Sequence, residues 1–394
     1  MRTPLAAALA ALLLAAPAAS GAPDLGALAG DALDRAATLA LPAVYRVETT
    51  VRLEGLVTAA GTGVDLPPGA RTVRDVGTAF GVAPGGMVVT AAHLASPRGE
   101  SLARAAYRRK LIEENRPQSE EIARDWVEAN GARPSGVEVT RLVLIQADAG
   151  AGARDAVTFR PQVRRIDRAA DLALLRIREA RSAPALPLQT SATIGTPVAT
   201  IGFGTGSAFT APDRGHLEPA VRKGELGPSG EAKDDLPGEI LTAVTTEIED
   251  GDSGGPVVDA DGHVRGVVIF SSADGGIMQR AAAVREVLQD AGIRPRAGET
   301  DRRFRDALAR FWALDFAPAE RGFARTSRAF ASHTLAGALR ERASSLRAAE
   351  FRLTAPRRTQ AFLLALGVVS AIAALACGLA LARPALARAF APEP

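Results

Sequence analysis

The stretch Gly251-Asp252-Ser253-Gly254-Gly255-Pro256 places one small nucleophile among glycines, and the apolar pair Val257 and Val258 follows it. Glycines adopt backbone angles that other residues resist, and they leave peptide N–H groups open to a ligand. A serine hydroxyl beside such donors is half of an acyl-transfer site, because the donors hold the oxyanion that forms when the hydroxyl attacks a carbonyl. The hydroxyl also needs a base, and the base needs a group that orients it.

His93 is the histidine best placed to be that base. Residues 77–82, 83–86 and 87–90 read as strand, tight turn and strand, which predicts a β-hairpin. The second strand leads directly into Ala91-Ala92-His93, and the small alanines leave room around an imidazole. The other three histidines are His216 in a loop, His263 in a turn and His333 in a late helical stretch.

Asp171 is the candidate for the orienting carboxylate. It begins the apolar strand 172–177, where a carboxylate lies against the core and is unfavourable unless it is paired. Asp167 is the rival carboxylate, in the preceding turn. A capping or turn role is the alternative for Asp171.

The chain between these motifs indicates an antiparallel β architecture, because short strands follow one another without long alternating helices. Residues 56–75 and 203–238 are rich in Gly, Pro and polar residues and are expected to be loops, the second with a short strand near 220–222. Residues 101–130 have helical periodicity broken near Pro117, which predicts a solvated helical insert; a lid or partner site beside a cleft is the alternative. Residues 281–292 predict a closing helix. The expected strands are 44–49, 77–82, 87–90, 137–146, 157–166, 172–177, 195–202, 240–246 and 264–271.

Three motifs in this order resemble those of the chymotrypsin-like (trypsin-like) serine peptidases. They are Thr90-Ala91-Ala92-His93, Asp171-Leu172-Ala173-Leu174-Leu175, and the stretch from Gly251 to Pro256. The opening Gly77-Thr78-Ala79-Phe80 and the lack of disulfides look most like the bacterial HtrA/Deg-like branch. The resemblance covers residues 43–292.

The resemblance implies a mainly β fold of two six-stranded antiparallel barrels, with the helical insert at 98–132. It implies Ser253 as nucleophile, His93 as general base and Asp171 as the group that orients the imidazole. The backbone N–H groups of Gly251 and Ser253 would form the oxyanion hole, and neither a cofactor nor a metal is implied. Strand 266–271 would pair with an extended substrate. The expected substrate-binding residues are Glu247, Ile248, Glu249, Ile269, Phe270 and Ser271; the two glutamates would favour basic substrate side chains or are solvated loop charges.

The chain departs from the HtrA pattern at Asp252, where HtrA-like proteins usually carry Asn. In chymotrypsin-type zymogens an Asp at this position pairs with a newly cut N-terminus, but this chain has no Ile-Val-Gly-Gly start. The partner of Asp252 is therefore an open question. No PDZ domain is expected either, because residues 294–360 are too few and too helical.

Both ends of the sequence carry membrane signals. Arg2, the apolar run 5–16 and small residues up to Ala22 have the order of a secretory signal peptide at 1–22, with an uncleaved anchor as the alternative. Residues 361–382 hold no charge, and 22 residues of helix span about 33 Å, enough to cross a bilayer core. We therefore expect export, a transmembrane helix at 361–382, and a cytoplasmic tail at 383–394.

The remaining segments are a helical lead-in at 23–42 and a helical juxtamembrane region at 293–358, which is either a stalk, an oligomerisation surface or a layer packed on the peptidase. Helices are expected at 301–315 and 320–352, separated near Pro318. Small residues recur every four positions in 361–382, which leaves a homo-oligomer open.

The composition excludes some classes of partner and ligand. The 394 residues carry a net charge of +3, and no basic stripe is interleaved with aromatics, so a nucleic-acid partner is not expected. Cys377 is the single cysteine, which excludes an intrachain disulfide and a Cys-based metal site and favours a bacterial source. The sequence predicts a membrane-anchored extracytoplasmic serine endopeptidase acting on proteins or peptides. A catalytically weak binding or sensor protein of the same fold, or an esterase, is the alternative.

Overall fold

The protein is described by a computed structural model that covers residues 30–146, 156–191, 193–204, 219–231, 240–272 and 275–353. The predicted signal peptide at 1–22 and membrane span at 361–382 lie outside these residues, as does the tail. Across the described ranges, no helix combines the length and apolarity needed to cross a membrane. The chain divides into two compact units, 1–340 and 341–394.

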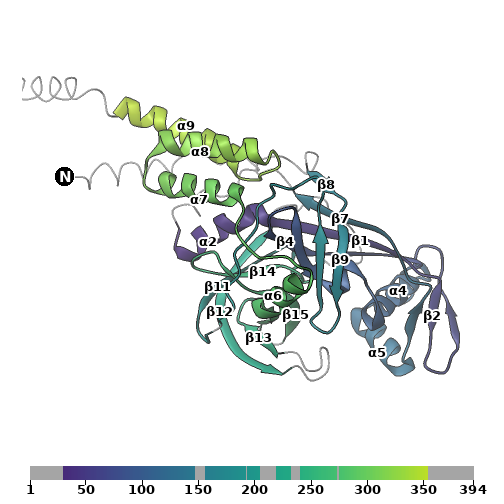
Figure 1. The fold of residues 1–394 in the computed structure, drawn as a ribbon. Coiled ribbons are helices and arrows are strands. Elements are labelled where there is room, and N and C mark those ends of the chain that lie inside the picture. Colours follow the sequence, from purple (N-terminus) through teal and green to yellow (C-terminus); the bar gives the residue numbers. More distant parts are fainter. Residues whose placement is uncertain are drawn as a thin grey trace, which may run out of the picture. The chain divides into compact units, whose positions relative to one another are not determined.

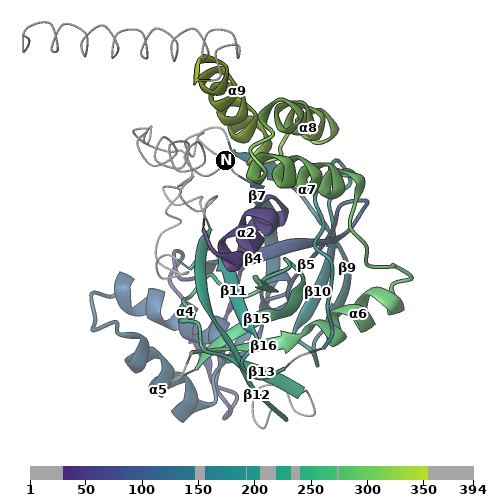
Figure 2. The same ribbon diagram turned by 90° about the vertical axis from the view of Figure 1, so that its left-hand side faces the viewer.

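The first half of the fold is a seven-stranded antiparallel sheet with the strand order β8-β7-β1-β4-β5-β10-β9. Its strands are labelled in Figure 1 and Figure 2 taken together. Helix α2 (Ala32–Ala40) and a short 3-10 turn (Leu41–Ala43) lead into it. Its strands are β1 (Val44–Arg52), β4 (Thr72–Ala83), β5 (Met87–Ala91), β7 (Glu138–Gln146), β8 (Val157–Phe159), β9 (Gln162–Asp167) and β10 (Leu172–Arg176). The predicted hairpin is confirmed as β4 and β5, with Gly85 and Gly86 both at positive φ in the turn.

The second half is a closed six-stranded antiparallel barrel with the strand order β11-β12-β13-β16-β15-β14, most of which is labelled in Figure 2. Helix α6 (Ala281–Asp290) follows the last strand. The strands are β11 (Pro197–Gly202), β12 (Ala220–Glu231), β13 (Ile240–Val244), β14 (Pro256–Asp259), β15 (Val264–Ser272) and β16 (Gly275–Arg280).

The expectation of two closed barrels is wrong for the first half. Its edge strands β8 and β9 are consecutive and joined only by Arg160 and Pro161, so the sheet curls until its two edges meet at that corner. No ladder joins the edges among the described residues. Strand β8 has three residues, and Pro161 lacks the N–H that a ladder needs. The same proline splits the single strand predicted at 157–166.

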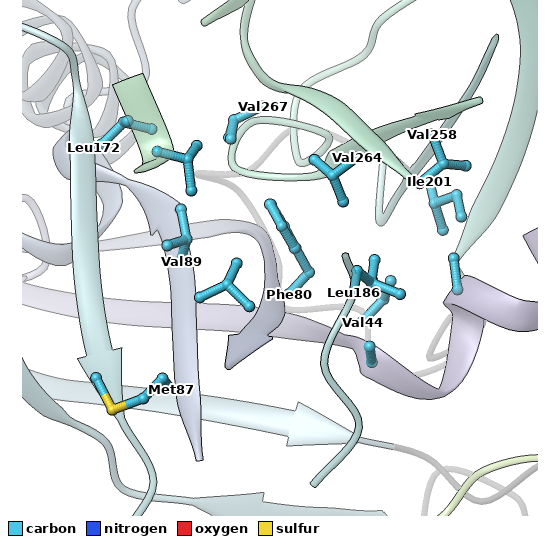
Figure 3. Close-up of a cluster of buried hydrophobic side chains, with 14 of the residues drawn as sticks. Val44, Phe80, Met87, Val89, Leu172, Leu186, Ile201, Val258, Val264 and Val267 are labelled. Atoms are coloured by element: carbon cyan, nitrogen blue, oxygen red, sulfur yellow. The ribbon is translucent and has the colours of Figure 1, made fainter. Parts of the chain in front are cut away.

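The core lies between the two halves. Phe80 on β4 is fully buried and sits between side chains of the first sheet and of the barrel (Figure 3). Val89 and Leu172 contribute from the sheet, and Ile201 and Val264 from the barrel. Because one cluster joins both halves, residues far apart in sequence are held at a common boundary, which is where the candidate site lies.

The segment expected as a loop at 56–75 instead contains two short strands and the start of β4, which begins at Thr72. Strands β2 (Gly55–Val57), β3 (Gly63–Asp65) and β6 (Arg133–Ser135) form a three-stranded sheet. Each strand has only three residues, too few for a periodic pattern to be visible in the sequence. The short strand expected near 220–222 is present but longer than expected, because the 12-residue β12 begins at Ala220 and pairs on both sides.

The predicted insert is confirmed as helices α4 (Gly99–Glu113) and α5 (Glu120–Asn130), grouped with β2 in Figure 1. Ser119 caps α5 by accepting the N–H of Ile122, and Gly131 ends it in the left-handed conformation. Tyr107 and Trp126 stack with ring centroids 3.8 Å apart and join the two helices. The two helices pack into one hydrophobic cluster that also includes Val51 of β1 and Val73 of β4.

The later helices are α7 (Glu299–Trp312), α8 (Phe316–Ala329) and α9 (Ala336–Leu353), the last of which crosses the boundary between the two units. The expected separation into two helices is present, but it lies at 313–315 and not at Pro318, because proline is tolerated in the first turn of α8. The expected single helix at 320–352 is wrong too, since residues 330–335 separate α8 from α9. Helix α7 packs on the body of the fold: Asp301 Oδ1 accepts the N–H of Ala185 at 2.9 Å.

Candidate active site

His93 and Asp171 are brought into direct contact by two adjacent strands. His93 follows β5 in the short helix α3 (Ala92–Ala95), and Asp171 precedes β10, which pairs with β5. Nδ1 of His93 lies 2.7 Å from Oδ2 of Asp171, and the backbone N–H of His93 donates to Oδ1 at 2.9 Å. The carboxylate thus holds both the ring and the backbone of His93, which leaves Nε2 facing away from it.

Asp171 has a left-handed backbone, with φ of +49°. Asp adopts this region more readily than most residues, although at some energetic cost. Its carbonyl accepts the N–H of Ala92 at 2.9 Å, so the strained turn is tied to the start of α3. Asp167, the rival carboxylate, instead accepts the N–H of Ala170 at 3.1 Å and closes the turn before Asp171.

Ser253 lies in the loop before β14, in the same cavity as His93 and Asp171. Its hydroxyl donates to the carbonyl of Ile269 at 2.8 Å. The structure therefore brings the three predicted residues to one cavity. No described hydrogen bond joins Ser253 to His93, because the serine hydroxyl is turned toward β15. A rotation about the serine side-chain bond is needed to present the hydroxyl to Nε2.

The serine loop is held by backbone contacts from both halves of the fold. Thr78 of β4 donates its N–H to the carbonyl of Ser253 at 2.8 Å and its hydroxyl to the carbonyl of Gly251 at 2.7 Å. Gly254 has φ of +84°, and a Cβ there would lie 2.1 Å from the carbonyl oxygen of Thr78. The loop therefore requires glycine at 254 because the β4 backbone approaches it closely.

The N–H groups of Gly251 and Ser253 donate to no acceptor among the described residues, whereas those of Gly254 and Gly255 donate to Val268 and Asp252. These are the two donors that the sequence predicted for an oxyanion hole. Buried N–H groups are almost always paired. Two unpaired ones beside a serine hydroxyl can bind the oxygen of a substrate carbonyl.

The cavity has a volume of about 860 Å³. Among the predicted substrate-binding residues, Ile248, Glu249, Ile269, Phe270 and Ser271 line it, while Glu247 does not. The insert reaches it too, because Glu100, Ser101 and Arg104 of α4 are lining residues. The insert therefore lies beside the cleft. This position agrees with the alternative prediction for residues 101–130, a segment beside a cleft, and not with a purely solvated surface insert.

Strand β15 offers an open edge to this cavity. Val267 pairs with Pro256 of β14, and Val268 exchanges hydrogen bonds with Gly254 and Gly255. Beyond Val268, no described strand pairs with this edge, although the other edge continues its ladder with β16. Unpaired backbone groups in an extended strand can bind an extended peptide as an added strand.

Asp75 is a cavity residue that sequence reasoning missed. It lies on β4 just before Val76, lines the cavity with His93, and has its pKa raised to about 6 by burial, with the nearby Asp250 adding to this effect. Burial alone would lower the pKa of His93, but the hydrogen bond and charge of Asp171, together with the charge of Asp75, raise it above the ordinary value. Two carboxylates therefore favour the imidazolium, the form that gives its proton to a leaving group.

A separate turn, 259–263, brings Asp259, Asp261 and His263 together within 4.8 Å. Asp259 is already engaged there, because it accepts the backbone N–H groups of Asp261 and His263 and the Nε of Arg265 at 2.6 Å. These contacts give the group a structural role in closing the turn.

Comparisons with known proteins find one matching family model and several solved structures. Residues 77–267 match the family model described as a trypsin-like peptidase domain, a range that includes His93, Asp171 and Ser253. Among solved structures, the HtrA-type protease AlgW with decapeptide matches at 18% identity and a TM-score of 0.41, covering 65% of this chain and 66% of that one. The Rv3671c protease from M. tuberculosis, active form, matches at 19% identity and a TM-score of 0.40, covering 67% of this chain and 86% of that one. No curated protein matches the chain.

The chain spans less than two thirds of the length of AlgW. The family-model match confirms the resemblance to chymotrypsin-like serine peptidases that the motifs predicted. Residues 77–267 of this chain therefore form a trypsin-like peptidase domain.

Proposed function

We propose that the chain is a serine endopeptidase that cleaves peptide bonds through Ser253, His93 and Asp171. The observation that carries the proposal is the 2.7 Å contact between His93 Nδ1 and Asp171 Oδ2 in a cavity that Ser253 also lines. A fixed imidazole beside a serine hydroxyl and two unpaired N–H donors supplies the base, the nucleophile and the oxyanion site of acyl transfer.

In this mechanism the Ser253 hydroxyl leaves the Ile269 carbonyl and donates to Nε2 of His93. As Oγ attacks the substrate carbonyl carbon, Nε2 takes its proton, and the oxygen of the tetrahedral intermediate accepts from the N–H groups of Gly251 and Ser253. The imidazolium, held by Asp171, then protonates the departing amine, and an acyl-enzyme remains on Ser253. Water deprotonated by His93 attacks the acyl-enzyme and releases the second product.

Protein or peptide substrates are favoured over small esters by the shape of the site. The open edge of β15 from Ile269 to Ser271 lies beside Ser253 and can hold several residues of an extended backbone. The cavity of about 860 Å³ is larger than a short acyl group needs. These features support an endopeptidase.

The catalytically weak binding protein is supported by one specific observation. Ser253 donates to the carbonyl of Ile269 at 2.8 Å, so its hydroxyl is not poised on the imidazole. If this state persisted with substrate bound, the site would bind peptides without cleaving them.

The proposed location is the extracytoplasmic side of a bacterial cytoplasmic membrane, with the peptidase domain exported and the chain anchored at 361–382. The signal-like order of residues 1–22 and the uncharged stretch 361–382 support it. Fractionation of cells, followed by protease accessibility of the peptidase domain, tests it; a domain protected in spheroplasts contradicts it.

The activity is tested with the full chain and a fluorogenic peptide-amide library, alongside an unfolded protein substrate. We expect cleavage that Ser253→Ala and His93→Ala each abolish. Ser101→Ala is the matched control, because Ser101 lines the same cavity from the helical insert, outside the proposed triad and the predicted substrate-binding residues. Cleavage of a short acyl ester without any amide cleavage would favour the esterase, and equal activity of Ser253→Ala would refute the proposal.

A further inference from the structure

Asp252, beside the proposed nucleophile, is a buried carboxylate with only 2% of its side chain exposed. Its Oδ1 accepts the N–H of Gly204, and its Oδ2 accepts the N–H of Glu249, both at 2.9 Å. Burial raises its pKa, and the Glu249 hydrogen bond and the charge of Arg222 oppose this effect. A carboxylate in such a place stays ionised only when a cation accompanies it.

Arg222 is that cation. It projects from β12, where it pairs in register with Thr200 of β11. Its Nη1 donates to Oδ2 of Asp252 at 2.9 Å, and its Nη2 lies 2.8 Å from Oε2 of Glu249. The fork of one guanidinium therefore bridges the carboxylate under the serine loop and the glutamate in the cavity wall. Among the described residues, Arg222 and Glu249 are the charged groups that face Asp252.

The end of β11 is shaped as a socket for this carboxylate. A Cβ on Gly202 would lie 2.4 Å from Oδ1 of Asp252, and a Cβ on Gly204 would lie 2.5 Å from Oδ2. Contacts this short exclude any side chain at either position. The two glycines, the two N–H donors and Arg222 together enclose Asp252.

The socket sets the positions of the proposed oxyanion donors. Asp252 lies between Gly251 and Ser253, both of which line the cavity. It closes the loop on itself, because its side chain accepts from the N–H of Glu249 and its own N–H donates to the carbonyl of Glu249 at 3.0 Å. Moving the Asp252 carboxylate therefore moves both donors.

We propose that Arg222 is the internal counter-ion of Asp252 and a positioning residue for catalysis: it holds the serine loop in the shape that presents the N–H groups of Gly251 and Ser253. The chain then needs no newly cut N-terminus to form its oxyanion hole. The inference rests on the proposed peptidase function for its kinetic part and on loop geometry for its structural part.

The test replaces Arg222 in the full chain by Gln, which removes the charge, and by Lys, which keeps it. We expect Arg222→Gln to lower kcat about 100-fold, similar to the loss of one oxyanion donor, with KM changed less than about threefold. Its kcat should also fall as pH rises, because ionisation of Asp252 is then unopposed. Arg222→Lys should recover part of kcat and the wild-type pH profile, since a point charge replaces the fork.

Arg265→Gln is the matched control. Arg265 pairs through Nε with the buried Asp259 of the same barrel, with side-chain exposure of 15% against 20% for Arg222. This ion pair is outside the serine loop, so its loss should lower stability and leave kcat and its pH profile unchanged. If Arg265→Gln reduced kcat as much as Arg222→Gln, the effect would be general destabilisation and the inference would be overturned.

Hydrogen exchange of the peptide containing residues 249–255, measured by mass spectrometry, supplies a readout that needs no activity. Faster exchange of this peptide in Arg222→Gln, together with wild-type exchange in Arg265→Gln, supports the inference. This result would hold even if the wild-type chain cleaved no substrate. The absence of cleavage would refute the proposed function separately. Wild-type exchange in this peptide, or wild-type kcat at every pH in Arg222→Gln, overturns the inference. If Arg222→Gln does not fold, Arg222→Lys is compared with wild type instead. Faster exchange at 249–255 and lower kcat in Arg222→Lys than in wild type then support the inference. Unchanged exchange and unchanged kcat contradict the need for the guanidinium fork.

Discussion

Replacing Asp171 by Asn removes the charge that faces His93 and changes little else. Asn tolerates the left-handed backbone of this position, so the turn before β10 is expected to keep its shape. Its amide oxygen can still accept the N–H of His93, now 2.9 Å from Oδ1. The amide NH₂ then faces Nδ1 and requires that nitrogen to be the acceptor. Nε2 consequently carries the proton and cannot take one from Ser253.

The magnitude follows from the contacts. A hydrogen bond between charged partners contributes about 1.5–3 kcal/mol, which corresponds to roughly a 10- to 150-fold loss when the imidazolium is no longer stabilised. The wrong tautomer adds to this loss, and we expect kcat to fall by about 10⁴ in total. The acid limb of the pH profile should also move to lower pH, because the hydrogen bond and charge of Asp171 raise the pKa of His93 against the effect of burial.

The assay measures kcat and KM on a peptide amide between pH 5 and 9 for wild type, Asp171→Asn and Asp167→Asn. Asp167 is the matched control, since it caps the same turn through the N–H of Ala170 without contacting His93. Asp167→Asn should retain kcat. Retention of kcat in Asp171→Asn, or an equal loss in Asp167→Asn, would refute the role assigned to the His93–Asp171 contact.

Three further predictions concern charge and packing. Asp75→Asn removes a negative charge that raises the pKa of His93, so the acid limb of kcat/KM should move to lower pH; a shift to higher pH would contradict this. Phe80→Ala should lower the free energy of unfolding by about 3–5 kcal/mol, measured by urea denaturation, because Phe80 fills the core between the two halves. His333 is buried with its pKa lowered to about 3 from 6.5, so between these pH values the unfolded chain binds a proton that the folded chain does not. Stability should therefore fall as pH decreases through this window, by up to about 1.4 kcal/mol per pH unit, and His333→Leu should reduce that slope.

Local pattern and motif chemistry predicted the parts of the fold that neighbouring residues determine. The β4–β5 hairpin, strand β10 and helices α4 and α5 each have a clear period and a turn or cap signal, and they appear where expected. Only the start of β12, near 220–222, was predicted, because Gly224, Gly227, Pro228 and Gly230 obscure the pattern of the rest. Pairing with β11 and β13 overrides the low strand propensity of these residues. The sequence did not predict that the first sheet stays open. Whether its edge strands β8 and β9 pair depends on their positions in the whole fold, and no local sequence pattern encodes this.

The candidate site likewise contains residues that local sequence predicts and residues that it does not. His93, Asp171 and Ser253 are recognisable because each lies in a distinctive local sequence, and the structure brings them to one cavity. Asp75 and Arg222 have ordinary sequence surroundings, and their importance arises from contacts across the fold: Asp75 with the charge of His93, and Arg222 with Asp252. The alternation around Ala220-Val221-Arg222 indicated a strand but carried no information on what the arginine faces.

The most direct test of the account is to label the full chain with a fluorophosphonate probe and to locate the adduct by tandem mass spectrometry. Three serines line the cavity, Ser101, Ser253 and Ser271, so the position of the adduct discriminates between them. We expect a single adduct on Ser253 that forms in wild type and is lost in His93→Ala. An adduct on Ser101 or Ser271, or undiminished labelling of Ser253 in His93→Ala, would contradict it.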